Sequence, residues 1–256
     1  MDAVLSQPQA VLGKRTRMFR VIEEGSLRSD LERRREMKFL LRGADVGKLR
    51  RLLESNGRRQ IHNEQVSTVR SVYFDDLKLS SCHDNLDGVG RRRKVRLRWY
   101  DALQPAHDFF FEIKWRDSNV TGKHRVQIRS AEPLSSLPYT AIANELFESL
   151  PVQHIRDFAI SAEPIVIVQY KREHFTSHDG CLRITLDYDL AFYNQTGKRS
   201  ISTSFVERMD GFVLLEGKVP LGRESELKRL LHPFHPRADS CSKYVLGCQM
   251  LGLIPT

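Results

Sequence analysis

RRRKVRLRWY, at residues 91–100, decides the fold of this chain of 256 residues. Side chains of a β-strand point alternately to the two faces of its sheet, so one face of this segment is apolar and the other is cationic. The cationic face carries Arg92, Lys94, Arg96 and Arg98, followed by Tyr100. FFFEIKW, at residues 109–115, repeats the alternation with Glu112 and Lys114 on its charged face. A solvated basic face explains one such strand most simply. Because like charges aligned across a sheet repel, a polyanion or a metal-bound phosphate against this face is the alternative.

The same alternation recurs along the chain and favours that alternative. Further strands are expected at residues 32–41, 67–74, 120–129, 164–175, 183–190 and 205–219, and helices at residues 44–56, 133–154 and 242–253. At least seven strands then have an apolar face and a face rich in Lys, Arg, Asp and Glu. Such a number of charged faces is unusual if they only meet solvent.

We therefore expect an α+β fold built on a closed antiparallel β tunnel barrel of about eight strands. Its interior is charged, helices brace its outside, and the C-terminal helix closes it. Buried charges must be paired or bound to metal or phosphate. Pairs two residues apart on one strand face are available for this, namely Glu36 with Lys38, Glu112 with Lys114, and Glu216 with Lys218.

Composition sets the remaining bounds. Residues 1–28 mix Gln, Pro, Gly and basic residues without periodicity, so we expect a flexible basic tail followed by one tunnel domain at residues 29–256. The net charge of +9 suits an anionic partner. Four scattered cysteines without a CxxC pair indicate neither a zinc site nor a disulfide framework. With no signal-peptide pattern and no apolar run near the roughly 18 residues of a membrane span, we expect a soluble cytoplasmic protein.

Several functional classes are disfavoured. The chain has no Walker A loop, nucleophile elbow or HExxH motif. A nucleic-acid binder would use the positive charge in a salt-dependent way, but the cations alternate along many strands without stacking aromatics between them on those faces. His232 and His235 flank a Pro-Phe pair in an expected loop, and we do not expect them to bind metal.

A set of short motifs, in this order, resembles the VTC domain. They are EMKF at 36–39, SVYFD at 71–75, RRKVRLRWY at 92–100, FFEIKW at 110–115, the Lys123 and Arg125 pair, VQYKREHF at 168–175, RITLDYDLAF at 183–192, LLEGKVP at 214–220 and SKYVLGCQMLGL at 242–253. This domain is the polyphosphate polymerase module of the vacuolar transporter chaperone family and belongs to the CYTH-like, triphosphate tunnel metalloenzyme superfamily. The resemblance covers about residues 30 to 255. It implies an ATP:polyphosphate phosphotransferase that moves the ATP γ-phosphate onto a growing polyphosphate chain inside a basic tunnel.

The resemblance also implies site residues. The catalytic set is Lys38, Arg96, Arg98, Lys114, Arg172 and Glu216. Glu216 is in addition the implied ligand of Mn²⁺ or Mg²⁺, ions that prefer oxygen ligands. The substrate-binding set is Lys123, Tyr170, Ser242 and Lys243, to which we add Lys94, Arg125 and Lys218 on the same charged faces. Phosphoryl transfer needs mainly positioning and charge neutralisation, which Arg, Lys and a divalent ion supply.

Some readings stay open. Glu216 could simply pair with Lys218, Ser242 and Lys243 could only cap a helix, Tyr170 could be packing, and Asp187 and Glu112 could only neutralise neighbouring cations. Arg34 replaces the first Glu of the ExExK motif of triphosphatase relatives, which moves the first strand towards anion binding. The eukaryotic module carries a phosphate-sensing domain and membrane helices for which this chain has no room. A triphosphatase using water as acceptor and a binding module without catalysis are the alternatives, and no nucleic-acid partner is expected.

Overall fold

The computed structural model describes residues 17–25, 34–62, 64–118, 120–236 and 241–255. Its strands are β1 (Phe19–Gly25), β2 (Arg34–Arg42), β3 (Gly57–Gln60), β4 (Ser67–Asp75), β5 (Arg91–Tyr100), β6 (Asp108–Asp117), β7 (Val120–Ser130), β8 (Glu163–Ser177), β9 (Arg183–Asn194), β10 (Val206–Met209) and β11 (Phe212–Pro220). Its α-helices are α1 (Val46–Ser55), α2 (Ser80–Leu86), α3 (Tyr139–Ser149), α4 (Val152–Ala159), α5 (Glu224–Leu231) and α6 (Lys243–Met250). None of the helices in these ranges is long and apolar enough to cross a membrane.

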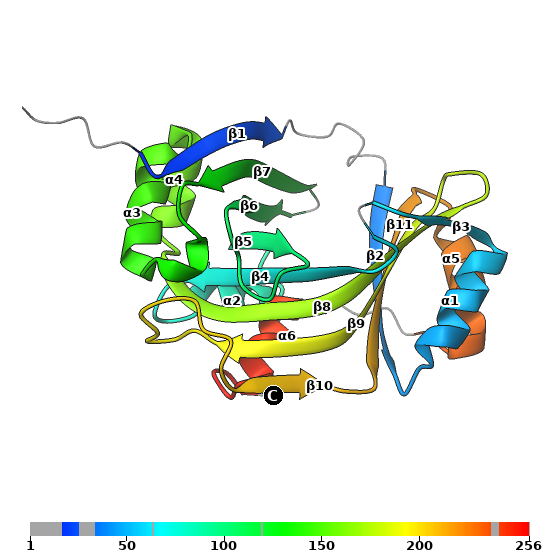
Figure 1. Cartoon of the computed structure of the whole chain (residues 1–256). Helices are drawn as coiled ribbons and strands as arrows, with labels where there is room; N and C mark the ends of the chain where they lie inside the picture. Colours follow the sequence, from blue (N-terminus) through cyan, green and yellow to red (C-terminus); the bar gives the residue numbers. More distant parts are fainter. Residues whose placement is uncertain (1–16, 26–33, 63, 119, 237–240, 256) are drawn as a thin grey trace, which may run out of the picture.

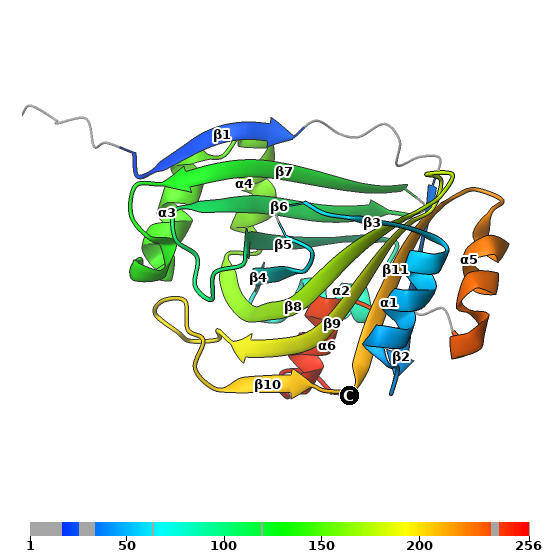
Figure 2. The same cartoon turned by 45° about the vertical axis from the view of Figure 1, so that its right-hand side comes forward.

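All eleven strands join one antiparallel sheet (Figure 1). Its order is β1-β7-β6-β5-β4-β8-β9-β11-β2, while β3 pairs with β8 and β10 pairs with β9. The long strands β8 and β9 run from the part of the sheet beside α3 and α4 to the part beside α1 and α5, and the sheet curls along them (Figure 2). Within the described residues, β1 and β2 end the order and do not pair with each other. The sheet is thus curled but not closed by hydrogen bonds.

The expected antiparallel α+β tunnel fold is confirmed, but two details of the prediction were wrong: the described strands do not close into a barrel by hydrogen bonds, and there are more of them than expected. The eight longest strands, β2, β4–β9 and β11, include those expected from alternation, and three short strands add to them. The segment expected as one strand at residues 205–219 is two successive strands, β10 and β11, which both pair antiparallel with β9. The break between them falls at Asp210-Gly211, where Gly211 has a φ of 72°. Glycine suits this break because it adopts positive φ freely.

The expected flexible tail is wrong for its last part, because β1 lies within residues 1–28. Phe19 is buried against Phe109, with ring centroids 5.3 Å apart, and the strand pairs with β7 along its length. The Glu145 side chain of α3 accepts hydrogen bonds from the backbone N–H groups of Met18 and Phe19. Residues 1–16 lie outside the described residues, so the tail prediction is untested there.

Two hydrophobic cores cover one face of the sheet, which we call the outer face. The apolar side chains of β5–β7 pack against α3 and α4 through residues such as Leu97, Ile142 and Phe158. Those of β2, β9 and β11 pack against α1 and α5 through residues such as Leu49 and Leu227. The alternation of each strand therefore sends its charged side chains to the opposite, inner face.

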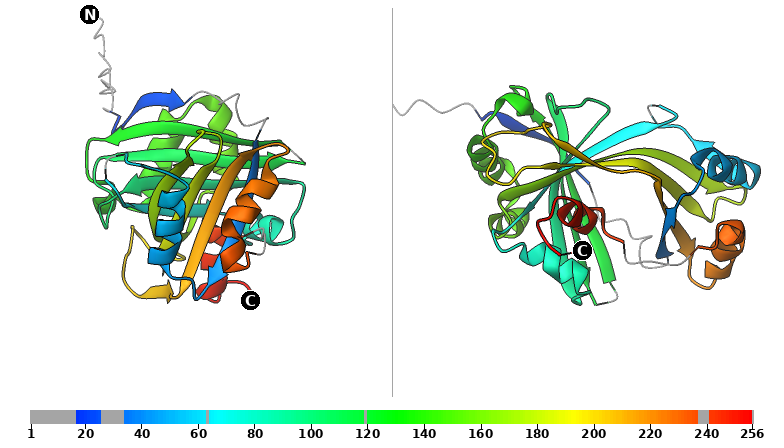
Figure 3. Two further views of the ribbon diagram at one scale, coloured as in Figure 1. Left: turned by 90° about the vertical axis from the view of Figure 1, so that its right-hand side faces the viewer. Right: turned by 90° about the horizontal axis from the view of Figure 1, so that it is seen from below.

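The C-terminal helix α6 covers part of the inner face (Figure 3). The rings of Tyr73 in β4 and Tyr244 in α6 stack with centroids 5.0 Å apart, and the Tyr244 hydroxyl donates to Asp75 at 2.7 Å. Asp75 also accepts from the backbone N–H groups of Ser81 and Cys82 at the start of α2. Gly247 allows this close approach, because a Cβ there would lie 2.9 Å from the Phe192 ring. These contacts hold the start of α6 against the charged strands.

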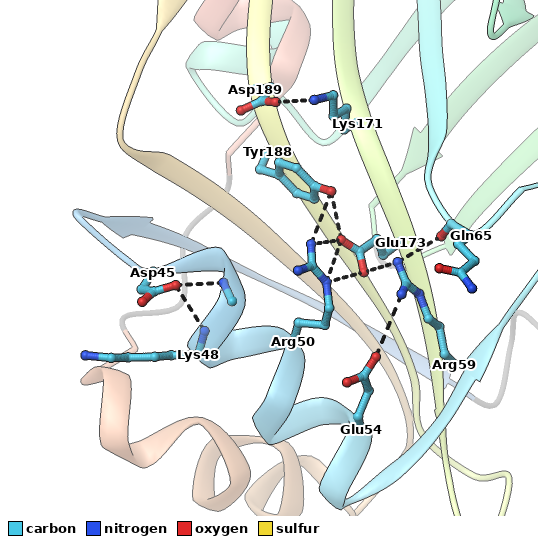
Figure 4. A network of polar contacts seen from close by, with 11 residues as sticks. Asp45, Lys48, Arg50, Glu54, Arg59, Gln65, Lys171, Glu173, Tyr188 and Asp189 are labelled. Carbon is cyan, nitrogen blue, oxygen red and sulfur yellow. Dashed lines mark hydrogen bonds and ion pairs between the residues drawn. The ribbon is translucent and has the colours of Figure 1, made fainter.

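A buried ion network fixes α1 and β3 to the sheet (Figure 4). The Glu173 carboxylate of β8 is fully buried and accepts from Arg50 of α1 at 2.6 Å and from the Tyr188 hydroxyl at 2.8 Å. Arg59 of β3 forms an ion pair with the same carboxylate at 2.5 Å. Glu173 has the opposite alternation to Arg172, so this network is structural and separate from the inner face.

Candidate functional site

Inner-face cations line up across three neighbouring strands. Lys94 of β5 lies directly opposite Lys114 of β6, and Lys114 lies opposite Lys123 of β7. In the next row, Arg96 lies opposite Glu112 and Glu112 opposite Arg125. Like charges placed opposite each other in a sheet repel, so these rows are favourable only with carboxylates or bound anions between them.

Glu112 is the carboxylate at the centre of these rows. It is fully buried and forms ion pairs with Arg96 and Lys123 at 2.6 Å, Arg125 at 3.4 Å and Arg98 at 3.6 Å. Burial by itself would raise the pKa of Glu112, but the charges of Arg98, Arg96 and Lys123 hold it well below its usual range. Glu112 therefore stays ionised and holds four cations in place.

Asp187 of β9 also holds inner-face cations in place, namely those of β8 and of the start of α6. It is fully buried and accepts two hydrogen bonds from Arg172, at 2.6 and 2.7 Å. The Lys243 ammonium, at the start of α6, lies 2.7 Å from the Oδ2 atom of Asp187. The Lys94 ammonium donates to the hydroxyl of Ser242 at 3.0 Å. The start of α6 thus brings Ser242 and Lys243 to the inner face.

The curl of the sheet brings distant strands together at Glu36. This carboxylate of β2 lies 3.1 Å from Lys114 of β6 and 3.2 Å from Lys38 of its own strand. β6 and β2 are six places apart in the sheet order, so the Lys114 contact spans the inner space. This ion pair connects the two end regions of the curled sheet, which backbone hydrogen bonds between the described strands do not join.

Only one of the three expected same-strand pairs forms. Glu36 pairs with Lys38, but Glu112 pairs with cations of β5 and β7 rather than with Lys114. Among the described residues, no ion pair joins Glu216 to Lys218; instead Lys218 lies opposite Glu36 and Arg183 in register. The physical reason is distance. Residues two apart on one strand are separated by about 6.7 Å along it, whereas the Cβ atoms of residues opposite each other on neighbouring strands are about 5 Å apart.

Tyr170 holds cations on this face. Its hydroxyl accepts from Arg98 at 3.3 Å, and the Lys243 ammonium and the Arg172 guanidinium lie 4.7 and 5.1 Å from its ring centroid. Tyr73, which is not among the predicted site residues, accepts from Arg96 at 2.7 Å. In the sequence, the only indication of its position was that Tyr73 lies two residues after Ser71, on the same face of the strand. Both tyrosines orient the arginines by hydrogen bonding and cation–π attraction.

Glu216 of β11 differs from the other inner-face carboxylates. It lies opposite Lys38 on one side and Thr185 on the other, yet it makes no hydrogen bond or ion pair with any residue in the described ranges. Burial would raise its pKa, but the charges of Lys114, Lys38, Arg172 and Lys243 hold the pKa of Glu216 well below its usual range. It is an ionised carboxylate with cations around it and no direct partner.

This environment fits a divalent ion bound together with phosphate. The described residues contain no group of three or more His, Cys, Asp or Glu side chains able to hold a metal. Mg²⁺ and similar ions are commonly held by one or two carboxylates, with phosphate oxygens and water as the other ligands. The free carboxylate of Glu216 and the unpartnered, buried hydroxyl of Thr185 beside it suit that mode.

Three of the inner-face lysines have lowered pKa values. Burial lowers the pKa of Lys114, although Glu36 opposes the shift. Burial lowers the pKa of Lys123 to about 7, although Glu112 opposes the shift. Burial, followed by the charges of Lys38 and Lys114, holds the pKa of Lys94 well below its ordinary range. The inner face therefore carries less positive charge than its number of lysines suggests.

A pH prediction follows for the ligand-free protein. Between about pH 7 and pH 10 the unfolded chain binds a proton at Lys123 that the folded chain does not, so the free energy of unfolding should rise with pH. Urea unfolding at pH 7, 8 and 9 measures this. Lys123→Met should show a smaller rise, whereas Lys171→Met, in an exposed ion pair with Asp189, should match the unmutated protein. Equal slopes for Lys123→Met and the unmutated protein would contradict the prediction.

A separate cavity lies on the outer side, beside α1 and α5, with a volume of about 550 Å³. Its lining includes Leu52, Phe175, Arg223 and Leu230, and none of the predicted site residues. We therefore place the candidate site on the inner face, where every predicted site residue lies.

Comparisons with known proteins come from a family model and from solved structures. The family model of the VTC domain matches residues 33–252. No curated protein matches the chain.

Three solved structures match the chain at low sequence identity. A Hippeastrum protein studied as an adenylyl cyclase candidate, with a dominant triphosphatase activity, is 14% identical over 83% of this chain and 95% of its own, with a TM-score of 0.46. An adenylate cyclase candidate from Bacillus halodurans is 14% identical over 81% and 92%, with a TM-score of 0.46. A protein from Pyrococcus horikoshii is 11% identical over 86% and 98%, with a TM-score of 0.45.

Proposed function

The chain belongs to the VTC domain family, and from this premise we propose that it is a metal-dependent polyphosphate polymerase. It transfers the γ-phosphate of ATP to a growing polyphosphate chain on the inner face. Family membership supports the fold and the substrate class, and the inner face supports the choice of site. The reaction itself is our proposal.

The observation that carries this proposal is the excess of cations over carboxylates on the inner face. The carboxylates are Glu36, Glu112, Asp187 and Glu216, and the cations are Lys38, Lys94, Arg96, Arg98, Lys114, Lys123, Arg125, Arg172, Lys218 and Lys243. Even if Lys94, Lys114 and Lys123, whose pKa values are lowered, are left out of these ten, seven cations face four carboxylates, and a bound triphosphate or polyphosphate would neutralise the excess. Burying unpaired cations is costly, so the face is arranged for a polyanion.

The roles of the chain's own residues follow from their contacts. Glu112 fixes Arg96, Arg98 and Lys123, and Asp187 fixes Arg172 and Lys243, so these cations need little reorganisation when phosphate oxygens arrive. Lys38 and Lys114 share one carboxylate, that of Glu36, so each ammonium keeps N–H groups that can donate to the transferring phosphate. Positioned cations of this kind supply most of the stabilisation in phosphoryl transfer.

Glu216 would hold Mn²⁺ or Mg²⁺ against the phosphate. Such an ion, when bound, neutralises charge that develops on the phosphate oxygens. The protein would supply a half-buried, ionised carboxylate for it, with Lys38 opposite on β2 and Lys114 reaching from β6 across the inner space. A triphosphatase would use the same residues with water as acceptor, and a binding module would use the cations without Glu216.

Replacing Lys114 tests whether triphosphate is turned over on the inner face. Lys114→Met should lower kcat/KM for ADP release from ATP by about 10- to 100-fold, the range expected for a lost hydrogen bond to a charged group. ADP release counts transfer and hydrolysis alike, so the assay holds for either enzyme.

Lys171→Met is the matched control, because Lys171 lies on β8 and forms an exposed ion pair with Asp189. It should keep the unmutated rate. Equal kcat/KM values for the two variants would place turnover elsewhere. Tripolyphosphate binding without any ADP release would leave only a binding module.

A further inference from the structure

The hydroxyl of Thr185 is an unexplained polar group on the inner face. Its Oγ1 atom is buried and has no hydrogen-bond partner among the described residues. Buried polar groups in proteins are nearly always hydrogen-bonded, and each exception calls for an explanation. Threonine also costs stability here compared with an apolar side chain of the same shape.

The register of four strands shows what surrounds this hydroxyl. Thr185 of β9 lies opposite His174 of β8 on one side and Glu216 of β11 on the other, and Glu216 lies opposite Lys38 of β2. Burial, followed by the charge of Arg172, lowers the pKa of His174 to about 4, so the ring is neutral. Thr185 is thus a neutral donor at the boundary between the neutral ring and the charged groups.

Neither of its neighbours uses the hydroxyl. His174 makes an edge contact with the ring of His62, at 4.6 Å between centroids, and no hydrogen bond with Thr185. Glu216, directly opposite, also makes no hydrogen bond or ion pair within the described ranges. A buried donor and a half-buried acceptor, directly opposite each other, therefore both lack a partner among the described residues, on the face that we propose takes triphosphate.

We propose that the Thr185 hydroxyl donates a hydrogen bond to an oxygen of the bound triphosphate or polyphosphate beside Glu216. This inference rests on the proposed function, because it names a further residue of the same site. A hydroxyl can satisfy a phosphate oxygen without adding charge next to Glu216 and Lys38. It fixes the position of the phosphate along β9 and β11, between the cations held by Asp187 and the carboxylate of Glu216.

The test separates a substrate contact from a structural one by measuring binding and stability together. Thr185→Val keeps the shape of the side chain and removes the donor. Its affinity for inorganic tripolyphosphate, measured by calorimetry without divalent ions, should fall by about 10- to 100-fold. Its Tm without ligand should rise by about 2 to 4 °C, because an unpartnered hydroxyl has been removed. Thr185→Ser keeps the donor and should bind as the unmutated protein does.

Thr121→Val, at an exposed threonine of β7, controls for the change from threonine to valine in a strand and should leave binding unchanged. Tripolyphosphate affinity of Thr185→Val equal to that of the unmutated protein would overturn the inference and leave the proposed function standing. A fall in Tm would also count against it, because it would show that the hydroxyl has a structural partner. Failure of the unmutated protein to bind tripolyphosphate would instead refute the proposed function.

Discussion

Asp187→Asn should lower the free energy of unfolding by about 3 to 5 kcal/mol, the usual cost of removing one partner from a buried ion pair. Asp187 is fully buried and its carboxylate is shared by Arg172 and Lys243, at 2.6 to 2.7 Å. The amide has nearly the same shape but leaves both cations without a counter-charge inside the protein. Urea unfolding of the two proteins at the same pH measures the difference.

Asp189→Asn is the matched control for this change. Asp189 lies two residues further along β9 and pairs with Lys171, and both side chains are about half exposed. Exposed pairs contribute about 0 to 1 kcal/mol, so this variant should unfold almost as the unmutated protein does. Similar losses of unfolding free energy in the two variants would show that Asp187 does not stabilise the buried cations of the inner face.

Ligand binding should partly reverse the effect. Tripolyphosphate oxygens can take the place of the lost carboxylate beside Arg172 and Lys243, and a ligand that binds only the folded state stabilises it. The rise in Tm on adding tripolyphosphate should therefore be larger for Asp187→Asn than for the unmutated protein. An equal or smaller rise would indicate that these two cations do not meet the polyanion.

Glu216→Gln should lower kcat for ADP release from ATP by about 100-fold or more, the scale on which single groups that stabilise transition-state charge act. The amide cannot hold a divalent ion as the ionised carboxylate can. The fold should be retained, because Glu216 makes no ion pair with the described residues. Tripolyphosphate binding without metal should be as tight as in the unmutated protein or tighter, because a negative charge among Lys38, Lys114, Arg172 and Lys243 has gone.

Glu207→Gln removes an exposed carboxylate of β10 and serves as the control. It should change neither kcat nor binding. An unchanged kcat in Glu216→Gln would exclude Glu216 as the metal ligand. Loss of tripolyphosphate binding together with kcat would point to a structural fault rather than to the metal.

Alternation in the sequence predicted the long strands and the faces of their side chains. Arg96, Lys114 and Arg172 lie on the inner face because strand parity is fixed by the backbone. β3 escaped prediction, since its four residues are too few to show a period, and β10 was predicted only as part of one longer strand. β1 is held by Phe19 and by Glu145, which is more than a hundred residues away in sequence.

The ion-pair partners could not be predicted from the sequence. Lys114 meets Glu36 only because the sheet curls and brings β6 near β2. Glu112 pairs with four cations of β5 and β7 because these strands lie on either side of β6. Residue spacing along one strand does not predict such neighbours. Thr185 gave no signal, because a threonine in a strand is ordinary until its register with Glu216 is known.

The polymerase assignment is tested most directly by the product made from ATP. Purified unmutated protein would be incubated with ATP and Mn²⁺, and in parallel with ATP and a chelator, and the products separated on a gel that resolves polyphosphate. We predict chains that lengthen with time in the presence of Mn²⁺ and none with the chelator. Free phosphate without chains would contradict the assignment and identify a triphosphatase on the same inner face.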